Sequence, residues 1–362
     1  MEDRGDSKQD CIFCEAFQYS SVIKYMGQQY TNTLAKPPSG KIKIYFLKEI
    51  WQHYQNLGKK NVPASTLDWK YINAVCNTLG LGLEPLMRYF KASMPSFEEF
   101  ETWILKEGQV SQAMVEHFNA IVEQKGQVRF ELQEEVLSTT DLEQWDRDGY
   151  VVVKNAIPKA DCAATAQFIY DTLEADADQP DTWYKAMKER QGIMIQLFNT
   201  PLLVKNRLSK RIRLAFEQLW QRTDLLVTND RVSFNPPETS FYPFQGPHLH
   251  WDMSLKRPIP FGTQGLVYLT DTAKNQGAFT LIPGFHKLID RWLEELGPED
   301  DPRDLKLLSD FKREPIAAEA GDLIIWNQCL PHGSSPNTSQ EPRLVQYINY
   351  QPLDLEYQQE WI

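Results

Sequence analysis

The second half of the chain is a succession of short runs of β-branched and aromatic residues separated by Gly and Pro. Runs of this length, bounded by turn residues, are typical of strands rather than helices. They lie at residues 225–228, 231–234, 266–270, 278–282, 323–326 and 344–350. Many short strands with such turns predict a β-sandwich or a β-barrel. A charged, Pro-interrupted stretch at 290–314 predicts a helical insertion between two of the strands.

The first part of the chain has a helical pattern instead. Ser96 and Glu99 have the spacing of a capping box, and apolar residues at helical spacing follow them. The pattern changes near residue 140, where Thr140 and Glu143 have the same capping-box spacing. We therefore predict a mostly α-helical amino-terminal region at residues 1–135 and a β-rich domain at 136–362.

Length and composition favour an ordinary globular protein. A chain of 362 residues with 42% hydrophobic residues is long for one domain and can bury a full core. Its net charge of −11 argues against nucleic acid as a partner. Residues 1–10 lack the pattern of a signal peptide, and the apolar runs are too short to cross a membrane. We expect no membrane contact and a cytoplasmic location.

Cysteine usage fits that expectation. The five cysteines are an odd number scattered along the chain, which favours a reducing compartment over a disulfide framework. Cys11 and Cys14 form a C-x-x-C pair, but no second pair and no nearby histidine completes a zinc site. We therefore assign this pair no function.

His250 and Asp252 form the most informative short motif of the chain. On an extended strand, side chains at i and i+2 point to the same side, so both could bind one metal while Trp251 faces away. A third ligand must then come from elsewhere, and His332 follows a turn and a buried-strand pattern at 321–326. Two imidazoles and one carboxylate that leave three positions open are typical of non-haem Fe(II) oxygenases.

Five segments in this order resemble the phytanoyl-CoA dioxygenase family of Fe(II)- and 2-oxoglutarate-dependent oxygenases. They are residues 145–153, 250–252, 277–287, 321–323 and 332–334, the last followed by Arg343. The resemblance covers residues 140–352. It implies an α+β fold, in which a double-stranded β-helix (a jelly-roll or cupin-like barrel) follows the amino-terminal helical region.

The resemblance also implies roles for individual residues. His250, Asp252 and His332 would be the catalytic iron ligands. Arg343 would bind the distal carboxylate of 2-oxoglutarate, helped by the hydroxyl of Ser334. A planar guanidinium suits that task because it bonds a carboxylate through two parallel hydrogen bonds.

Further roles follow from the same resemblance. Tyr268 lies where the family has an aromatic residue beside the co-substrate. Related halogenases have Gly or Ala in place of Asp252, so a carboxylate at this position favours hydroxylation over halide transfer. The implied reaction consumes O2 and releases succinate and CO2.

The substrate is predicted from the residues near the metal motif. Four of them could line a pocket: His248, Trp251, Arg231 and Asn327. This mixture of aromatic, cationic and amide groups favours a small polar metabolite or an amino-acid-derived intermediate over a long acyl chain. We therefore predict hydroxylation of an unactivated C–H bond in such a compound.

Two other functions remain open at this point. The same ligands could serve a cupin-like metal oxygenase or isomerase that does not use 2-oxoglutarate, although Arg343 and Ser334 argue against it. A non-catalytic β-barrel binding protein is the other alternative, and the complete triad argues against that. The amino-terminal region could form a lid, a homodimer contact or a contact with a carrier protein.

Overall fold

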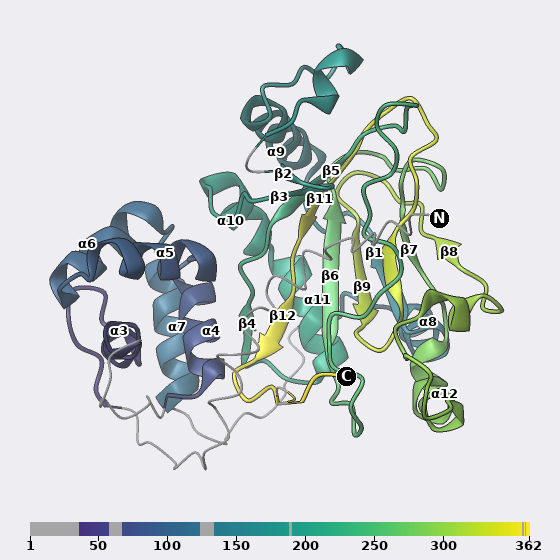
Figure 1. The fold of residues 1–362 in the computed structure, drawn as a ribbon. Coiled ribbons are helices and arrows are strands. Elements are labelled where there is room, and N and C mark those ends of the chain that lie inside the picture. Colours follow the sequence, from purple (N-terminus) through teal and green to yellow (C-terminus); the bar gives the residue numbers. More distant parts are fainter. Residues whose placement is uncertain (1–35, 58–66, 124–133, 188–189, 357, 359) are drawn as a thin grey trace, which may run out of the picture. The chain divides into compact units, whose positions relative to one another are not determined.

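The computed structural model describes residues 36–57, 67–123, 134–187, 190–356, 358 and 360–362 (Figure 1). All of these residues fall within one compact unit of the chain. Cys11 and Cys14 therefore lie outside the described residues. Among the residues described, no helix is both long and apolar enough to span a membrane.

The β-rich part of the chain forms antiparallel sheets, as the strand-like runs of the sequence predict. The largest sheet of the described residues has seven strands, in the order β1 (Tyr150–Val153), β9 (Leu323–Asn327), β6 (Thr263–Tyr268), β11 (Arg343–Tyr347), β5 (Val232–Asn235), β3 (Met194–Ile195) and β2 (Arg190–Gln191). A three-stranded sheet has the order β10 (His332–Ser334), β7 (Phe279–Leu281) and β8 (Glu314–Pro315). The strands β12 (Tyr350–Pro352) and β4 (Leu225–Val227) pair separately (Figure 1).

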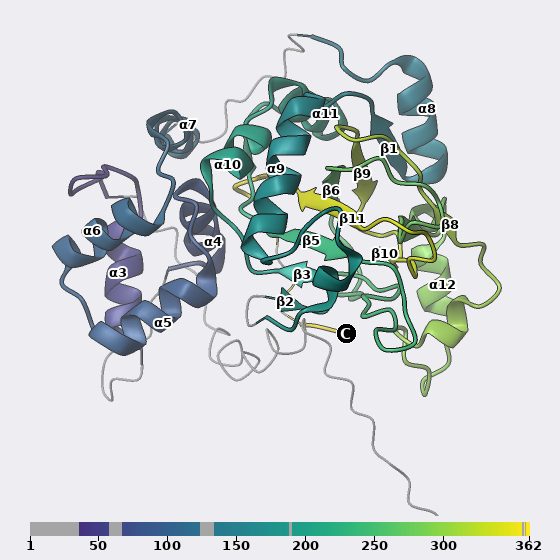
Figure 2. The ribbon, with the colours of Figure 1, turned by 90° about the horizontal axis from the view of Figure 1, so that it is seen from above.

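The middle strands of this sheet, β5, β6, β9 and β11, are buried on both faces, and β9 is accordingly a continuous apolar run from Leu323 to Trp326. Val267 and Leu323 lie on the face that packs against helices α9 (Lys159–Thr172) and α11 (Lys210–Trp220). Leu266 and Ile324 lie on the opposite face, in a cluster shared with Phe279 of the three-stranded sheet. Figure 2 shows α9 and α11 on one side of β6 and β11, with β8 and β10 on the other.

The remaining helices complete the β-rich part and the region before it. Those of the β-rich part are α8 (Thr139–Asp148), η1 (Pro180–Tyr184), α10 (Pro201–Arg207), η2 (Phe285–Lys287), α12 (Ile289–Glu295) and η3 (Leu305–Leu308). The insertion predicted at 290–314 is confirmed, since it contains most of α12 and all of η3.

The amino-terminal region is helical over its described residues and has a core of its own. Its helices are α3 (Leu47–Asn56), α4 (Trp69–Thr78), α5 (Leu83–Ser93), α6 (Phe97–Glu107) and α7 (Gln112–Glu123). Ile72, Phe100 and Phe118 are fully buried in this core, which also takes in Leu226 of β4. The predicted capping box of Ser96 and Glu99 is confirmed at the start of α6.

The second predicted capping box is displaced by two residues. The structure places it at Ser138 and Asp141, not at Thr140 and Glu143. Ser138 has extended backbone angles and accepts a hydrogen bond from the amide of Asp141, whose carboxylate accepts from the amide of Ser138 (2.8 Å). Thr140 already lies inside the first turn of α8, so its hydroxyl cannot cap the helix.

We expect Ser138→Ala to lower the free energy of unfolding by about 1 kcal/mol, because it leaves the amide of Asp141 without its acceptor. Thr140→Ala is the matched control. It should leave stability unchanged or slightly higher, since Ala has the better helix propensity. Denaturant unfolding of the two variants measures both effects, and a larger loss for Thr140→Ala would show that the cap is assigned wrongly.

Candidate metal centre

His250, Asp252 and His332 lie together in the structure. Their ligand atoms are all within 4.8 Å of one another. The carboxylate oxygens of Asp252 lie 3.2 Å from the Nε2 atom of each histidine. His332 is almost fully buried, whereas the side chains of His250 and Asp252 are 24% and 23% exposed. The group can therefore be reached from solvent on the side of His250 and Asp252.

The two histidines face each other across an antiparallel bridge. The amide of His250 donates to the carbonyl of His332 (2.8 Å), and the amide of His332 donates to the carbonyl of His250 (3.0 Å). Their ring centroids are 4.7 Å apart. Main-chain hydrogen bonds between His250 and His332 thus bring these two residues together, although they are far apart in the sequence.

The backbone around the motif differs from the extended strand that we predicted. His250 forms a single bridge, and Asp252 lies in a bend. Gly333 allows the close approach, because a Cβ atom at this position would lie only 2.4 Å from the carbonyl oxygen of His248. The amide of Ser334 also donates to the carbonyl of Pro247 (3.0 Å). The glycine after His332 thus lets the two ligand segments pack against each other.

The hydrogen bonds of the two Nδ1 atoms orient both rings so that their Nε2 atoms face Asp252. The Nδ1 atom of His250 lies 2.7 Å from the carbonyl of His248, and that of His332 lies 2.9 Å from the carbonyl of Leu330. A carbonyl only accepts, so each Nδ1 carries the hydrogen and each neutral ring presents the Nε2 lone pair. Two imidazole nitrogens and one carboxylate fit the ligand set of a non-haem iron site.

The electrostatics keep Asp252 ionised. Burial raises the pKa of this carboxyl, but the neighbouring His250 and His332 outweigh burial and hold the pKa well below its usual value. Burial lowers the pKa of His250, whereas the Asp252 carboxylate raises it, and the net shift is upward. Asp252 is therefore an anion, as a carboxylate that binds a metal must be.

Gln264 and Trp326 fix the carboxylate of Asp252 in place. The Nε2 group of Gln264 donates to Oδ2 of Asp252 (2.6 Å), and the Trp326 indole donates to Oε1 of Gln264 (3.1 Å). Gln264 and Trp326 are direct partners in the β6–β9 register. Neither role was predicted from the sequence, because Gln264 follows Thr263 at the polar start of β6, before the apolar run that marks the strand.

We expect Gln264→Leu to weaken Fe(II) binding by about 10- to 100-fold, the usual effect of losing a group that orients a metal ligand. Trp326→Phe should have a smaller effect in the same direction, since it releases Gln264 but keeps its hydrogen bond to Asp252. Anaerobic titration against a competing chelator measures both. Unchanged affinity in Gln264→Leu would show that Asp252 does not depend on this bond.

Arg343 is a fully buried cation near the same centre. Its Nη1 donates to the hydroxyl of Ser334 and its Nη2 to that of Ser233, both at 3.1 Å, while Nε has no hydrogen-bond partner among the residues that the structure describes. Among the described residues, no carboxylate lies within ion-pair distance of Arg343. Ser334 is two residues from His332 on β10, so the guanidinium is tied to the strand that carries a ligand histidine.

A buried guanidinium without a carboxylate is costly unless a ligand supplies the anion. The buried Arg343 guanidinium is thus suited to bind an anionic ligand beside the candidate metal site. Ser233 was missed by the sequence analysis. It belongs to β5, and its place beside Arg343 follows from the β11–β5 pairing, which a sequence alone does not reveal.

Tyr268 lies in the buried cluster between the two sheets. Its hydroxyl donates to the carbonyl of Ile316 (2.8 Å) and accepts from the amide of Phe279 (2.9 Å). Burial raises the pKa of Tyr268 to about 12. The hydroxyl therefore ties β6 to the three-stranded sheet, and its predicted contact with the co-substrate stays a prediction.

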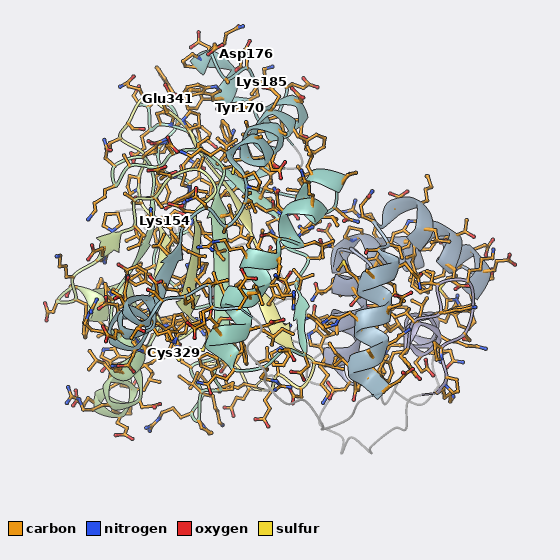
Figure 3. All side chains as sticks on the ribbon, turned by 180° about the vertical axis from the view of Figure 1, so that it is seen from behind. Lys154, Tyr170, Asp176, Lys185, Cys329 and Glu341 are labelled. Carbon is orange, nitrogen blue, oxygen red and sulfur yellow. The ribbon has the colours of Figure 1, made fainter. Side chains whose placement is uncertain are left out.

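Two of the predicted substrate residues, His248 and Trp251, differ in their exposure. His248 is exposed, and its ring lies 5.3 Å from that of Phe244. Trp251 is buried against Trp292, and its indole donates to the carbonyl of Cys329 (2.9 Å). Cys329 is labelled in Figure 3. Trp251 thus faces the apolar cluster, as its position between the two ligands predicts, whereas His248 is accessible.

The other two predicted substrate residues have local partners. Arg231 lies over the ring of Phe198 (5.7 Å) and 3.7 Å from the carboxylate of Asp230. The side-chain oxygen of Asn327 accepts from the amide of Cys329 (2.9 Å), which fixes the turn after β9. Substrate contact by either residue stays a prediction.

Comparison with known proteins decides the family. Residues 145–345 match the family model described as phytanoyl-CoA dioxygenase. The chain belongs to the phytanoyl-CoA dioxygenase family. It is an Fe(II)- and 2-oxoglutarate-dependent enzyme, and the His250, Asp252 and His332 group has the composition of a non-haem iron site.

The sequence identity between the chain and similar proteins is low, but the alignments cover most of the length of those proteins. A Dictyostelium discoideum protein named after phytanoyl-CoA dioxygenase is 24% identical over 58% of this chain and 74% of its own length. Human peroxisomal phytanoyl-CoA dioxygenase is 21% identical, with 64% and 73% covered. Ectoine dioxygenase of Bordetella bronchiseptica is 20% identical, with 61% and 77% covered.

Solved structures also resemble part of the chain. HygX from Streptomyces hygroscopicus, whose structure holds nickel and 2-oxoglutarate, aligns with a TM-score of 0.44 and 15% identity. The alignment covers 60% of this chain and 88% of HygX.

Proposed function

We propose that this family member hydroxylates an unactivated C–H bond in a small polar metabolite or an amino-acid-derived intermediate. The observation that supports 2-oxoglutarate use most directly is the buried guanidinium of Arg343, which is bonded to two serines and has no carboxylate partner among the described residues. A five-carbon diacid offers one carboxylate to the metal and the other to this guanidinium.

The residues have separate tasks in this proposal. His250, Asp252 and His332 would hold the iron. Bound iron and 2-oxoglutarate supply an oxidant from O2, with release of succinate and CO2. Arg343 and Ser334 orient the co-substrate through its distal carboxylate. Apolar side chains between the two sheets, such as Phe279 and Trp326, lie against the ring of His332 and limit the access of water.

The proposed architecture is a double-stranded β-helix at residues 136–362. The two antiparallel sheets that share one apolar cluster support it. We propose that residues 1–135 form a separate helical region that acts as a lid, a homodimer contact or a carrier-protein contact. The odd number of cysteines supports a cytoplasmic location.

Succinate release across a metabolite panel tests the substrate class. Polar metabolites and amino-acid derivatives should stimulate Fe(II)-dependent succinate release, whereas long-chain acyl-CoA compounds should not. Equal kcat/KM for a fatty acyl-CoA and for an amino-acid-like compound would contradict the proposed class. Turnover that needs iron but no keto acid would instead favour a cupin-like oxygenase or isomerase. A protein that binds metabolites without turnover would be a binding protein.

A further inference from the structure

The backbone around Asp252 is held by a residue from the insertion between β7 and β8. Arg303 lies between α12 and η3. Its Nη1 donates to the carbonyl of Trp251 (3.0 Å) and its Nη2 to the carbonyl of Met253 (2.7 Å). These are the residues on either side of Asp252, which lies in a bend rather than in a strand. The first bond holds the peptide group that joins Trp251 to Asp252, and the second holds the peptide group that follows Met253.

We propose that Arg303 is a positioning residue for Asp252 and that it acts without touching the metal or the substrate. This inference rests on the proposed function in one respect, because it takes the triad as the metal site. A guanidinium is suited to the task, since its planar fork of donors binds two carbonyls in one fixed geometry. A lysine ammonium keeps the charge but not that geometry.

Residues 360–362 also contact Arg303. Nη2 of Arg303 also donates to the carbonyl of Ile362 (2.9 Å), and the guanidinium lies 4.7 Å from the centre of the Trp361 ring. The same segment pairs with the chain just after the metal motif. The amide of Leu255 donates to the carbonyl of Ile362 (3.1 Å), and the hydroxyl of Ser254 donates to the carbonyl of Glu360 (2.7 Å).

A second contact from the insertion supports the same backbone. Trp292 of α12 packs against the indole of Trp251, with ring centroids 5.8 Å apart. Trp251 is therefore fixed through its side chain by Trp292 and through its carbonyl by Arg303. Because Trp251 lies between the two ligands, this part of the insertion limits the positions that His250 and Asp252 can adopt before the metal binds. A ligand that is already in place binds the metal more tightly.

Fe(II) affinity of the full chain, measured anaerobically against a competing chelator, tests this role. We expect Arg303→Ala to bind Fe(II) about 10- to 100-fold more weakly. Arg303→Lys should recover part of the loss, and Trp361→Ala should give a smaller loss. Arg291→Ala is the matched control, because Arg291 lies in the same insertion, is 73% exposed and forms an ion pair with Glu295 along α12. It should bind Fe(II) like the wild type.

The visible spectrum of the Co(II)-substituted protein adds a readout of ligand geometry. The spectrum should change in Arg303→Ala and stay the same in Arg291→Ala. Wild-type Fe(II) affinity in a folded Arg303→Ala protein would overturn the inference. If that variant does not fold, wild-type affinity in both Arg303→Lys and Trp361→Ala would overturn it equally. A wild-type protein that binds no Fe(II) would contradict the proposed function itself, which separates the two failures.

Discussion

Asp252→Asn is expected to lower Fe(II) affinity by more than the roughly 100-fold that loss of an orienting group can cost, and to abolish succinate release. The reason lies in the neighbouring hydrogen bonds as well as in the lost charge. Nε2 of Gln264 donates to Oδ2 of Asp252, so it requires an acceptor. In the variant, the Asn oxygen satisfies Gln264, and the NH2 group, which cannot bind a metal, is turned toward the ion.

Asp146→Asn is the control for this variant. Asp146 lies at the surface, where its side chain is 81% exposed and pairs with Lys287. Exposed ion pairs contribute little to stability, so this variant should fold and bind Fe(II) like the wild type. Anaerobic metal titration of both variants is the measurement. Tight Fe(II) binding by a folded Asp252→Asn protein would show that Asp252 is not a metal ligand.

Arg343→Gln should weaken 2-oxoglutarate binding by roughly 100-fold while Fe(II) affinity stays within a small factor of the wild type. Hydrogen bonds to charged groups are worth about 1.5–3 kcal/mol each, and a guanidinium–carboxylate pair makes two of them. Arg343→Lys should recover only part of this loss, since a lysine keeps the charge but cannot form the paired bonds.

Ser233→Ala and Ser334→Ala provide graded comparisons with Arg343→Gln. Each removes one acceptor of the Arg343 guanidinium (3.1 Å) without removing its charge, so the loss of 2-oxoglutarate affinity should be smaller. Titration of 2-oxoglutarate into the Fe(II)-loaded protein under anaerobic conditions measures all four variants. If Arg343→Gln lowers Fe(II) affinity as strongly as 2-oxoglutarate affinity, Arg343 supports the metal site instead of the co-substrate.

The sequence predicts the residues whose chemistry is distinctive, because the side-chain type itself carries the signal. His250, Asp252 and His332 were selected as a metal-binding set, and the structure brings their ligand atoms within 4.8 Å. The strand-like runs were also found, since an apolar strand between turn residues is a local pattern. The capping box at α8 was placed two residues late because two overlapping Ser/Thr and acidic pairs satisfy the same spacing.

The supporting residues were missed for a different reason. Gln264 meets Asp252 through the β6–β9 register, and Ser233 meets Arg343 through the β11–β5 register. Arg303 reaches the metal motif from an insertion whose sequence looks like an ordinary charged surface. In each case the residue type is common and only the tertiary pairing gives it a role, so no local pattern marks it.

The central claim is that the triad and Arg343 together bind iron and 2-oxoglutarate. The most direct test adds Fe(II) and then 2-oxoglutarate to the metal-free protein without oxygen and records the visible spectrum. We predict a weak charge-transfer band of an iron-chelated keto acid, which appears only after the second addition and is lost in Asp252→Asn. A protein that binds Fe(II) but shows no such band with saturating 2-oxoglutarate would contradict the account.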